Sequence, residues 1–506
     1  MKILSVTSEM YPLVKTGGLA DVAGALPLAL NKLGVEMRTV LPGYDPVLQH
    51  VTDAQPVLTI PSLFGEEATV LDAVVDGRRI YVVECPGFFR RAGGPYADIS
   101  GQEWPDNWLR FAALSKAAAM IAEGAIKDWV PDVVHAHDWQ AAMTLAYLRH
   151  GQSPTMPTVI TIHNLAFQGR FGFDIFDKLE LPPQAWNVDG VEYYGGVGYL
   201  KAGLVYADAI TTVSPTYADE IREHHNGMGL DGLLNGRSER LNGILNGIDN
   251  DQWDPSTDPH IKKTYTHNSI GQKQTNKRDL AARMGLDKDD SPILVVISRL
   301  TWQKGMDLLA EVVDDIVRSG MRLAVLGTGD RMLEGAFLYA SDRHRGRVGV
   351  RIGYDEAFAH ALLAGGDGIL IPSRFEPCGL TQLYGLRYGC VPVVSRVGGL
   401  ADTVVDANEA AIAAGAATGF QFSPPDTYHL RKVIDRFSKI YAKPPQFKAI
   451  QRAGMKTDNA WSNSASRYIA LYENLIEAQS QCSQTMPSAP ASKKVESRSK
   501  SGLQPS

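Results

Sequence analysis

Two successive series of short, almost continuously apolar segments set the strongest limit on how this chain can fold. Within each series the segments are rich in β-branched residues and alternate with longer stretches of helical apolar spacing. Such segments are typical of parallel strands that helices cover on both faces. The sequence therefore predicts an α/β protein with two doubly wound, Rossmann-like sheets. The expected strands are 3–7, 38–41, 133–136, 158–162 and 209–213 in the first series, and 293–298, 322–326, 348–352, 368–371 and 391–394 in the second.

A polar stretch separates the two series and indicates a domain boundary. The segment Asn246-Gly247-Ile248-Asp249 is rich in turn residues, and 250–290 is rich in Asp, Thr, Asn, Gln and Lys. We expect an N-terminal domain over 1–248 and a C-terminal domain over 249–478. Doubly wound sheets bind ligands outside the carboxyl ends of their strands, so two such domains facing each other would enclose a central cleft.

The end of the chain divides into a helical segment and a polar tail. Apolar residues at helical spacing predict an amphipathic helix over 462–477, which could pack back on the N-terminal domain. Residues 479–506 are dominated by Ser, Pro, Gln and Lys, which predicts a disordered tail. The apolar residues of the helix are Tyr468, Leu471, Tyr472 and Leu475.

Composition argues against several other classes of protein. The net charge is -6 over 506 residues and no dense basic stripe occurs, so nucleic acid is not an expected partner. No stretch approaches the roughly 18 uninterrupted apolar residues of a membrane span, so no membrane association is expected. The four cysteines form no C-x-x-C pair, which disfavours a zinc ribbon or a redox motif. Sparse cysteines and the lack of a signal-peptide core favour a cytoplasmic enzyme, and the oligomeric state stays open.

The first candidate binding segment is Lys15-Thr16-Gly17-Gly18-Leu19-Ala20-Asp21-Val22, just after the first expected strand. Gly17 and Gly18 would let the backbone approach a ligand closely, and a helix is expected to begin near Leu19. Free amides and the dipole at a helix start favour a phosphate, and Lys15 adds a full positive charge beside it. The alternative is an ordinary glycine-rich turn with a solvated lysine.

Two cations follow the first strand of the second series. Arg299 and Lys304 lie five residues apart where a strand end would face the cleft. There they could hold a diphosphate, with the arginine as a fork and the lysine as a point charge. A pair of solvated surface cations is the alternative interpretation.

The segment 374–382 offers both an acid and an anion site within one loop. Glu376 lies in a turn shaped by proline and glycine, where its carboxylate could accept hydrogen bonds from sugar hydroxyls. The amides of Gly379, Leu380 and Thr381 lie at an expected helix start, which suits a phosphate. Alternatively, Glu376 is only a capping carboxylate for that helix.

Histidines and an aspartate follow two strands of the first series. The segments are His135-Ala136-His137-Asp138 and Thr161-Ile162-His163-Asn164. Two histidines two positions apart could suggest a metal, but no third ligand has matching spacing, so no metal is predicted. Asp138 and His163 are instead expected to shape a sugar pocket.

Taken in this order, the motifs resemble those of bacterial glycogen synthases and plant starch synthases, over residues 1–477. The resemblance implies a GT-B fold and a retaining transfer of glucose from ADP-glucose to the non-reducing end 4-hydroxyl of an α-1,4-glucan. It also implies release of ADP and no cofactor. The segments that carry it are 8–22, 104–108, 135–139, 161–164, 245–249, 299–305, 376–382 and 398–404.

The same resemblance implies a role for each candidate residue. Lys15 and the Gly17-Gly18 loop would approach the donor phosphates, while Arg299 and Lys304 would neutralise the leaving diphosphate. Glu376 would be the essential acid, with Asp138 and His163 lining the glucose and its anomeric centre, and Tyr354 would be a platform for the adenine. The other implied donor-binding residues are Asp21, Asn246, Cys378, Gly379, Leu380 and Thr381.

Several alternatives remain open from the sequence. Another GT-B transferase would lack the Lys-Thr-Gly-Gly-Leu loop or would carry a second glutamate where this chain has Tyr384. A glucan phosphorylase would need a much longer chain, and a non-catalytic glucan- or nucleotide-binding protein would have no use for cations beside a sugar-facing acid. Cys378 is expected to be a buried inert thiol; the alternative is a thiol whose modification blocks the site. The sequence does not separate ADP-glucose from UDP-glucose.

Overall fold

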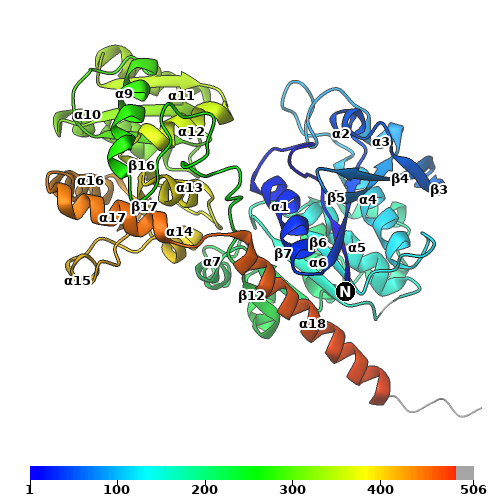
Figure 1. The fold of residues 1–506 in the computed structure, drawn as a ribbon. Helices are drawn as coiled ribbons and strands as arrows, with labels where there is room; N and C mark the ends of the chain where they lie inside the picture. The colour runs from blue at the N-terminus through cyan, green and yellow to red at the C-terminus, as the bar shows by residue number, and fades with distance from the viewer. Residues whose placement is uncertain (154, 486–506) are drawn as a thin grey trace, which may run out of the picture.

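The structure is a computed structural model that describes residues 1–153 and 155–485. It has two lobes joined by two stretches of chain (Figure 1). The N-terminal lobe is built on a nine-stranded sheet with the order β12-β11-β7-β6-β1-β2-β5-β4-β3. These strands are β1 (Lys2–Val6), β2 (Glu36–Pro42), β3 (Gln55–Leu63), β4 (Glu66–Val75), β5 (Arg78–Glu84), β6 (Val133–His137), β7 (Thr158–Ile162), β11 (Ala209–Thr212) and β12 (Leu241–Gly243).

The N-terminal sheet is parallel from β12 to β5 and antiparallel from β5 to β3. Many residues of β3 and β4 are exposed or half-buried, so these strands do not form the continuous apolar runs of strands covered on both faces. The sequence analysis expected no strands in this region and therefore missed this antiparallel edge. A separate three-stranded sheet has the order β8-β10-β9, with β8 (Arg170–Phe171), β9 (Glu192–Tyr193) and β10 (Gly196–Gly198).

The C-terminal lobe is built on a six-stranded, wholly parallel sheet with the order β15-β14-β13-β16-β17-β18. The chain runs outward from β13 to β15 and then returns to the other side of β13, so the topological switch point lies between β13 and β16. All the strands expected from the sequence occur in the two sheets. The strands of this lobe are β13 (Ile293–Ile297), β14 (Arg322–Gly327), β15 (Val348–Ile352), β16 (Gly368–Ile371), β17 (Val391–Ser395) and β18 (Phe420–Phe422).

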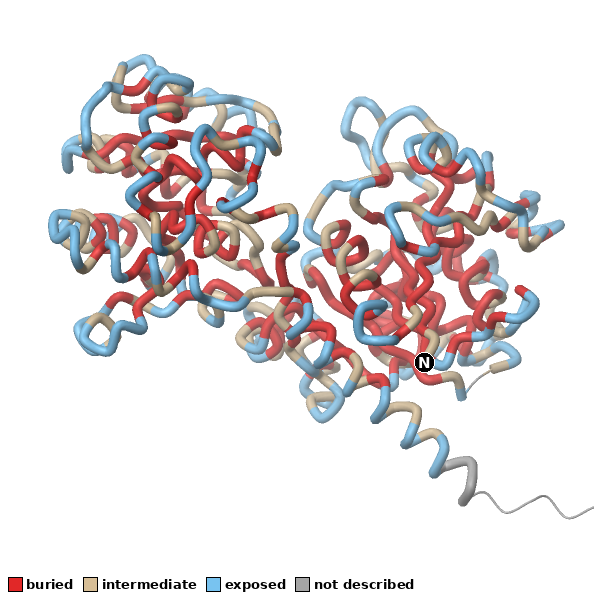
Figure 2. Tube along the Cα trace, in the orientation of Figure 1, coloured by how far each residue is buried: buried red, intermediate tan, exposed pale blue. Residues whose placement is uncertain are grey.

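Helices cover both faces of each sheet, and Figure 2 shows the buried inner faces in red. In the N-terminal lobe α1 and α18 pack on one face and α4, α5 and α6 on the other. In the C-terminal lobe α10, α11 and α16 pack on one face and α9 and α12 on the other. The N-terminal lobe contains α1 (Gly18–Lys32), α2 (Asp45–His50), α3 (Pro86–Phe89), α4 (Asn107–Ala122), α5 (Asp138–His150), α6 (Tyr199–Tyr206), α7 (Pro215–Glu220) and α8 (Asp231–Gly236). After it come α9 (Lys273–Arg283), α10 (Met306–Arg318), α11 (Arg331–Arg343), α12 (Glu356–Gly365), α13 (Thr381–Tyr388), α14 (Gly398–Thr403), α15 (Glu409–Ala413), α16 (Thr427–Tyr441), α17 (Pro444–Lys456) and α18 (Trp461–Thr485).

Helix α18 returns from the C-terminal lobe to the N-terminal sheet (Figure 1). Its Trp461, Tyr468 and Tyr472 are buried in one apolar cluster with residues of β1 and α1. The helix continues to Thr485, so the prediction of disorder from residue 479 was wrong for 479–485. Each added helical residue gains a backbone hydrogen bond once the helix is nucleated, and the buried tyrosines anchor it. The rest of the predicted tail, 486–506, lies outside the described residues.

The two connections between the lobes lie side by side. The Ile248 amide donates to the Asn459 carbonyl at 2.8 Å, and Ile248 and Ala460 form an isolated parallel bridge. A Cβ at Gly247 would come within 2.5 Å of the Trp461 amide nitrogen, so glycine permits this close approach. Within the described ranges, no helix has the length and apolar character needed to cross a membrane.

Candidate active site

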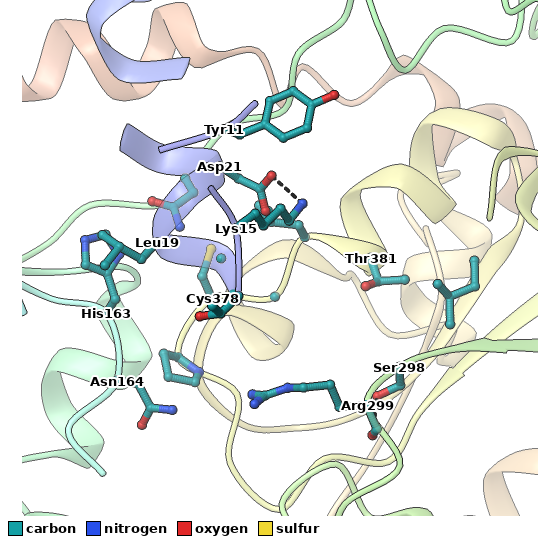
Figure 3. A pocket seen from close by; sticks show the side chains of 18 of the residues that line it. Tyr11, Lys15, Leu19, Asp21, His163, Asn164, Ser298, Arg299, Cys378 and Thr381 are labelled. Carbon is teal, nitrogen blue, oxygen red and sulfur yellow. Dashed lines mark hydrogen bonds and ion pairs between the residues drawn. The ribbon is translucent and has the colours of Figure 1, made fainter. Parts of the chain in front are cut away.

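One cavity of about 950 Å³ lies between the lobes, at the carboxyl ends of the central strands of both sheets (Figure 3). Loops after β1 and β6 line it from the N-terminal lobe, and loops after β13 and β16 line it from the C-terminal lobe. Both loop pairs flank a point where the strand order reverses, which is where doubly wound sheets bind ligands. The predicted site residues that line this cavity are Lys15, Gly17, Gly18, Asp21, Asp138, His163, Asn246, Arg299, Lys304, Tyr354, Glu376, Cys378, Gly379, Leu380 and Thr381.

A buried ion pair connects the two loops of the C-terminal lobe. The Lys304 ammonium lies 2.7 Å from each carboxylate oxygen of Glu376, and the Ser373 hydroxyl donates to the same carboxylate at 2.9 Å. These bonds account for both oxygens, so Glu376 holds the lysine and does not cap α13. Gly398 packs closely against this loop. Its φ is +41°, and a Cβ there would come within 2.0 Å of the Glu376 carbonyl oxygen, so only glycine permits this approach.

Arg299 is the unpaired cation of the cavity. Its side chain is exposed and has no hydrogen bond or ion pair to any residue in 1–153 or 155–485. Figure 3 shows its guanidinium extending into the cavity from the end of β13. A guanidinium presents a planar set of donors that matches phosphate oxygens. Arg299 is thus free to bind an anion, while Lys304 already has an anionic partner.

The glycine-rich loop after β1 is held by a carboxylate that the sequence analysis missed. Glu9 is buried, and its side chain accepts from the amides of Thr16 and Gly17 and, at 2.6 Å, from the Thr16 hydroxyl. The Tyr96 hydroxyl also donates to Glu9. The Gly17 amide is therefore occupied, and the amides that remain for a ligand at this helix start are those of the first turn of α1, beginning with Gly18. In the sequence, Glu9 was noted only as part of the Ser8-Glu9 pair within the family pattern.

Lys15 forms an ion pair with Asp21 across the first turn of α1, with 2.6 Å between its ammonium and the carboxylate (Figure 3). Burial is the main cause that raises the pKa of Asp21, and the nearby lysine opposes it. A Cβ at Gly17 or Gly18 would meet no atom within 4 Å. The packing of the protein itself therefore does not require glycine here, and the space is left on the cavity side of the loop.

We expect Gly18→Ala to leave the stability unchanged or to raise it, while weakening donor binding. Alanine is favoured over glycine in a helix by about 0.5–1 kcal/mol, and the added methyl group meets no protein atom. The same methyl group would occupy the space in which the sequence analysis expects a donor phosphate. Thermal unfolding and the KM for the nucleotide sugar test both parts together. A destabilised variant with an unchanged KM would contradict this assignment of the loop.

Asp138 and His163 line the cavity from the N-terminal lobe, at the ends of β6 and β7. Asp138 is the first residue of α5, has a φ of +55° and accepts from the His163 amide at 2.7 Å. Burial raises the pKa of Asp138 to about 7, while the amides of His163 and Asn164 oppose that rise. Burial also lowers the pKa of His163 well below its ordinary value, so its imidazole is neutral. The site therefore combines a neutral histidine with a carboxyl group that ionises near neutrality.

The stability of the wild type should fall relative to Asp138→Asn as the pH rises from about 4 to about 7. The folded carboxyl keeps its proton up to about pH 7, whereas the unfolded group loses it near 3.8. Folding then takes up a proton between these values, so stability is lost with rising pH. At about 1.4 kcal/mol per pKa unit, the change is a few kcal/mol. Urea unfolding of both proteins measures it, and a difference that stays constant with pH would argue against the raised pKa.

A polar cluster closes the far end of the cavity from three parts of the chain. Glu356 accepts from the Tyr354 hydroxyl at 2.9 Å, from the Gln252 amide at 2.8 Å and from the Tyr11 hydroxyl at 3.4 Å. The Tyr354 side chain is 66% exposed, so its ring face is open to a ligand. Sequence reasoning named Tyr354 alone, because the cluster depends on Tyr11 and Gln252, which are far from Glu356 in the chain.

The loop that follows Glu376 is fixed by Gln382, another residue that the sequence analysis missed. Its side-chain amide donates to the carbonyl oxygens of Cys378 and Gly379 at 3.0 and 2.9 Å. Gly379 has a φ of +71°, which favours glycine. The Cys378 thiol is buried, and burial raises its pKa to about 12. Such a thiol is unreactive near neutrality, which supports the inert interpretation of Cys378.

Tyr384, at the position where the sequence analysis expects a second glutamate in other GT-B transferases, is part of an aromatic stack. Its ring lies 3.9 Å from that of Trp253, which in turn lies 3.8 Å from the ring of His360. The Asp258 carboxylate accepts from His360 and lies 2.7 Å from its Nδ1. Over the described parts of the chain, no three His, Cys, Asp or Glu side chains are grouped so as to hold a metal ion.

Comparison with known proteins identifies the relatives of this chain. The family described as the starch synthase catalytic domain matches residues 2–236, and the family of glycosyl transferases group 1 matches residues 291–426. A glycogen synthase of Mesorhizobium japonicum is 58% identical over 94% of this chain and 99% of its own length. A glycogen synthase of Novosphingobium aromaticivorans is 57% identical, with the same coverage.

Solved structures show the same two-lobed fold. The catalytic domain of starch synthase IV from Arabidopsis thaliana, bound to ADP and acarbose, superposes with a TM-score of 0.84 at 29% identity. It covers 94% of this chain and 99% of its own. Sucrose-phosphate synthase from Thermosynechococcus elongatus has a TM-score of 0.56 at 17% identity over the same shares, which supports the fold alone.

Proposed function

This chain belongs to the family of bacterial glycogen synthases and plant starch synthases, a GT-B family of glucosyltransferases, and we propose how its cavity performs the reaction. The donor is ADP-glucose, and its glucose passes with retention to the non-reducing end 4-hydroxyl of an α-1,4-glucan as ADP leaves. The observation that carries the proposal is the Lys304–Glu376 pair beside the unpaired Arg299. The paired Lys304 and the free Arg299 lie at the same end of the C-terminal sheet, and two such cations suit a sugar diphosphate.

The choice of donor rests on the relatives. The plant starch synthase IV structure holds ADP, and this chain is similar to it over nearly its full length. Tyr354, with its open ring face, is the proposed platform for the adenine. The glycogen acceptor rests on the bacterial relatives named glycogen synthase. A cytoplasmic location stays a prediction from the sequence.

The leaving diphosphate is the group that the cavity stabilises most. Arg299 binds the diphosphate with its free guanidinium. The Lys304 ammonium, which is paired with Glu376, also attracts the diphosphate. The Gly18 amide and the amides at the start of α13 add partial positive charge. Preorganised donors of this kind act where charge develops in the transition state, and each typically contributes a factor of about 10²–10³ to the rate.

The glucosyl unit passes through an oxocarbenium-like transition state. The Asp138 carboxylate and the His163 carbonyl lie on the sugar side of the cavity, where they stabilise the developing positive charge. A double displacement through two paired carboxylates has no second member here, because Tyr384 stands at that position. We therefore favour same-face attack, in which the acceptor hydroxyl approaches as ADP leaves and a donor phosphate oxygen takes its proton.

Incorporation of labelled glucose into glycogen tests this function. Wild type and Glu376→Ala are compared with ADP-glucose and with UDP-glucose. We expect transfer from ADP-glucose that disappears in the variant. A preference for UDP-glucose would overturn the donor, and full activity of the variant would overturn the role of Glu376. Transfer from neither donor would favour a binding protein.

A further inference from the structure

Three buried histidines form a layer beneath the sugar side of the cavity, and the mechanism above uses only one of them. His135 and His137 lie on β6, with their side chains on one face of the strand, and His163 follows β7. They are 0%, 1% and 9% exposed. Only His163 lines the cavity, so the other two act on the reaction only through it.

His137 lies between His163 and a serine of the central strand. Its Nδ1 is 3.0 Å from Nε2 of His163, and its Nε2 is 3.1 Å from the Ser5 hydroxyl oxygen. Ser5 lies on β1 and is 1% exposed. His135 makes a separate set of bonds, because its Nδ1 is 2.7 Å from the Tyr472 hydroxyl and its Nε2 is 2.6 Å from that of Thr161.

Each imidazole of this layer carries a single proton near neutral pH. Burial lowers the pKa of His137 to about 3, and burial together with His137 lowers that of His163 well below its ordinary value. A hydrogen bond between His137 and His163 requires one proton between the two nitrogens. The contact therefore has only two arrangements, which differ in the donor.

The Ser5 hydroxyl decides between these arrangements. If His163 donated to His137, then His137 would donate to Ser5, and the serine proton would need another acceptor. The described residues offer Ser5 Oγ no partner besides His137. A buried donor without an acceptor costs about 1–3 kcal/mol. The favoured arrangement is the reverse: Ser5 donates to Nε2 of His137, and Nδ1 of His137 donates to Nε2 of His163.

We propose that Ser5 and His137 are positioning residues that fix the tautomer of His163, so that it presents an Nδ1–H donor to the glucosyl unit. The contact with His137 occupies Nε2 of His163, and no described residue bonds its Nδ1. The acceptor would be a hydroxyl or ring oxygen of the sugar. This inference rests on the proposed function in placing glucose at His163.

A fixed neutral donor has a physical advantage at this position. An imidazolium would repel the positive charge that develops at the anomeric centre, and the other neutral tautomer would offer a bare nitrogen to the sugar oxygens. A serine–histidine pair holds the donor form without adding a charge. The wrong tautomer of a catalytic histidine is known to lower turnover severely.

Ser5→Ala is the variant that tests the tautomer directly. Without the hydroxyl, Nε2 of His137 loses its donor, and we expect His163 to shift toward its Nε2–H form. Nitrogen NMR of ¹⁵N-histidine-labelled protein distinguishes protonated from bare ring nitrogens, with the His163 signals assigned by their loss in His163→Gln. We expect kcat to fall about 10- to 100-fold, the usual effect of removing an outer hydrogen-bond partner, while KM for ADP-glucose changes little.

Two further variants serve as controls. Thr161→Val removes a buried hydroxyl that bonds His135 instead, and it should leave the His163 tautomer and kcat unchanged. Ser5→Thr keeps a hydroxyl and should restore both. A wild type with the His163 proton on Nε2, or a Ser5→Ala variant with an unchanged tautomer or unchanged kcat, would overturn the proposal. The NMR result does not depend on activity. Failure of the tautomer proposal can therefore be distinguished from failure of the proposed function.

Discussion

Replacing Lys304 with alanine is expected to lower kcat by a factor of at least about 10²–10³, because the leaving diphosphate loses a preorganised cation. The protein should also become less stable. Lys304 is the ion-pair partner of the buried Glu376 carboxylate, and a buried charge without its partner is costly. Steady-state kinetics with ADP-glucose and urea unfolding measure the two effects separately.

Two further variants separate the catalytic effect of Lys304→Ala from its effect on stability. The double variant Lys304→Ala with Glu376→Ala should recover much of the stability but none of the turnover, because it no longer buries a lone carboxylate. Arg374→Ala breaks a similar pair with Asp307, 2.7 Å apart, but Arg374 does not line the cavity. It should leave kcat within a few-fold of the wild type. Wild-type turnover in Lys304→Ala would remove the residue from catalysis.

Replacing Arg299 with alanine should reduce kcat by a similar factor of about 10²–10³ with almost no change in stability. Its guanidinium bonds no described residue, so the free energy of unfolding should stay within about 0.5 kcal/mol of the wild type. Affinity for ADP should fall as well, since the same group binds the product diphosphate. Inhibition by added ADP measures that loss.

The controls for Arg299 separate charge from geometry. Arg299→Lys keeps the charge but loses the planar fork, so its activity should lie between those of the wild type and the alanine variant. Arg331→Ala removes an exposed arginine outside the cavity and should have no effect on kcat. A large loss of stability in Arg299→Ala would show that its role is structural.

The sequence was informative wherever a residue follows a buried parallel strand. Such strands form apolar runs, and their carboxyl ends meet at one edge, so the sequence alone places Lys15, Asp138, Arg299 and Glu376 near one cleft. For the same reason, the carboxyl ends of the expected strands were predicted to within one residue. The antiparallel edge formed by β3 and β4 was missed, because its half-exposed residues give no continuous apolar signal.

Contacts between distant segments were beyond the reach of local patterns. Glu9 holds the Gly17 loop, and Glu356 collects Tyr11 and Gln252 from other parts of the chain. Nothing in the residues next to Glu356 indicates these partners. Pairing also altered expected charges, since Lys15 and Lys304 were interpreted as free cations and each has a carboxylate partner. Charge type follows from sequence, whereas charge pairing follows from the fold.

The return of α18 to the N-terminal sheet constrains the order in which a nascent chain can finish folding. Ile3 and Val22 leave the ribosome early, but the Trp461 and Tyr468 that cover them are translated after almost the whole C-terminal lobe. During synthesis of the C-terminal lobe, the N-terminal lobe therefore exposes the apolar surface that α18 later covers. Exposed apolar surface of this kind is aggregation-prone. Truncated translation products stop before α18 and keep that face uncovered, so they are ready substrates for chaperones and proteases.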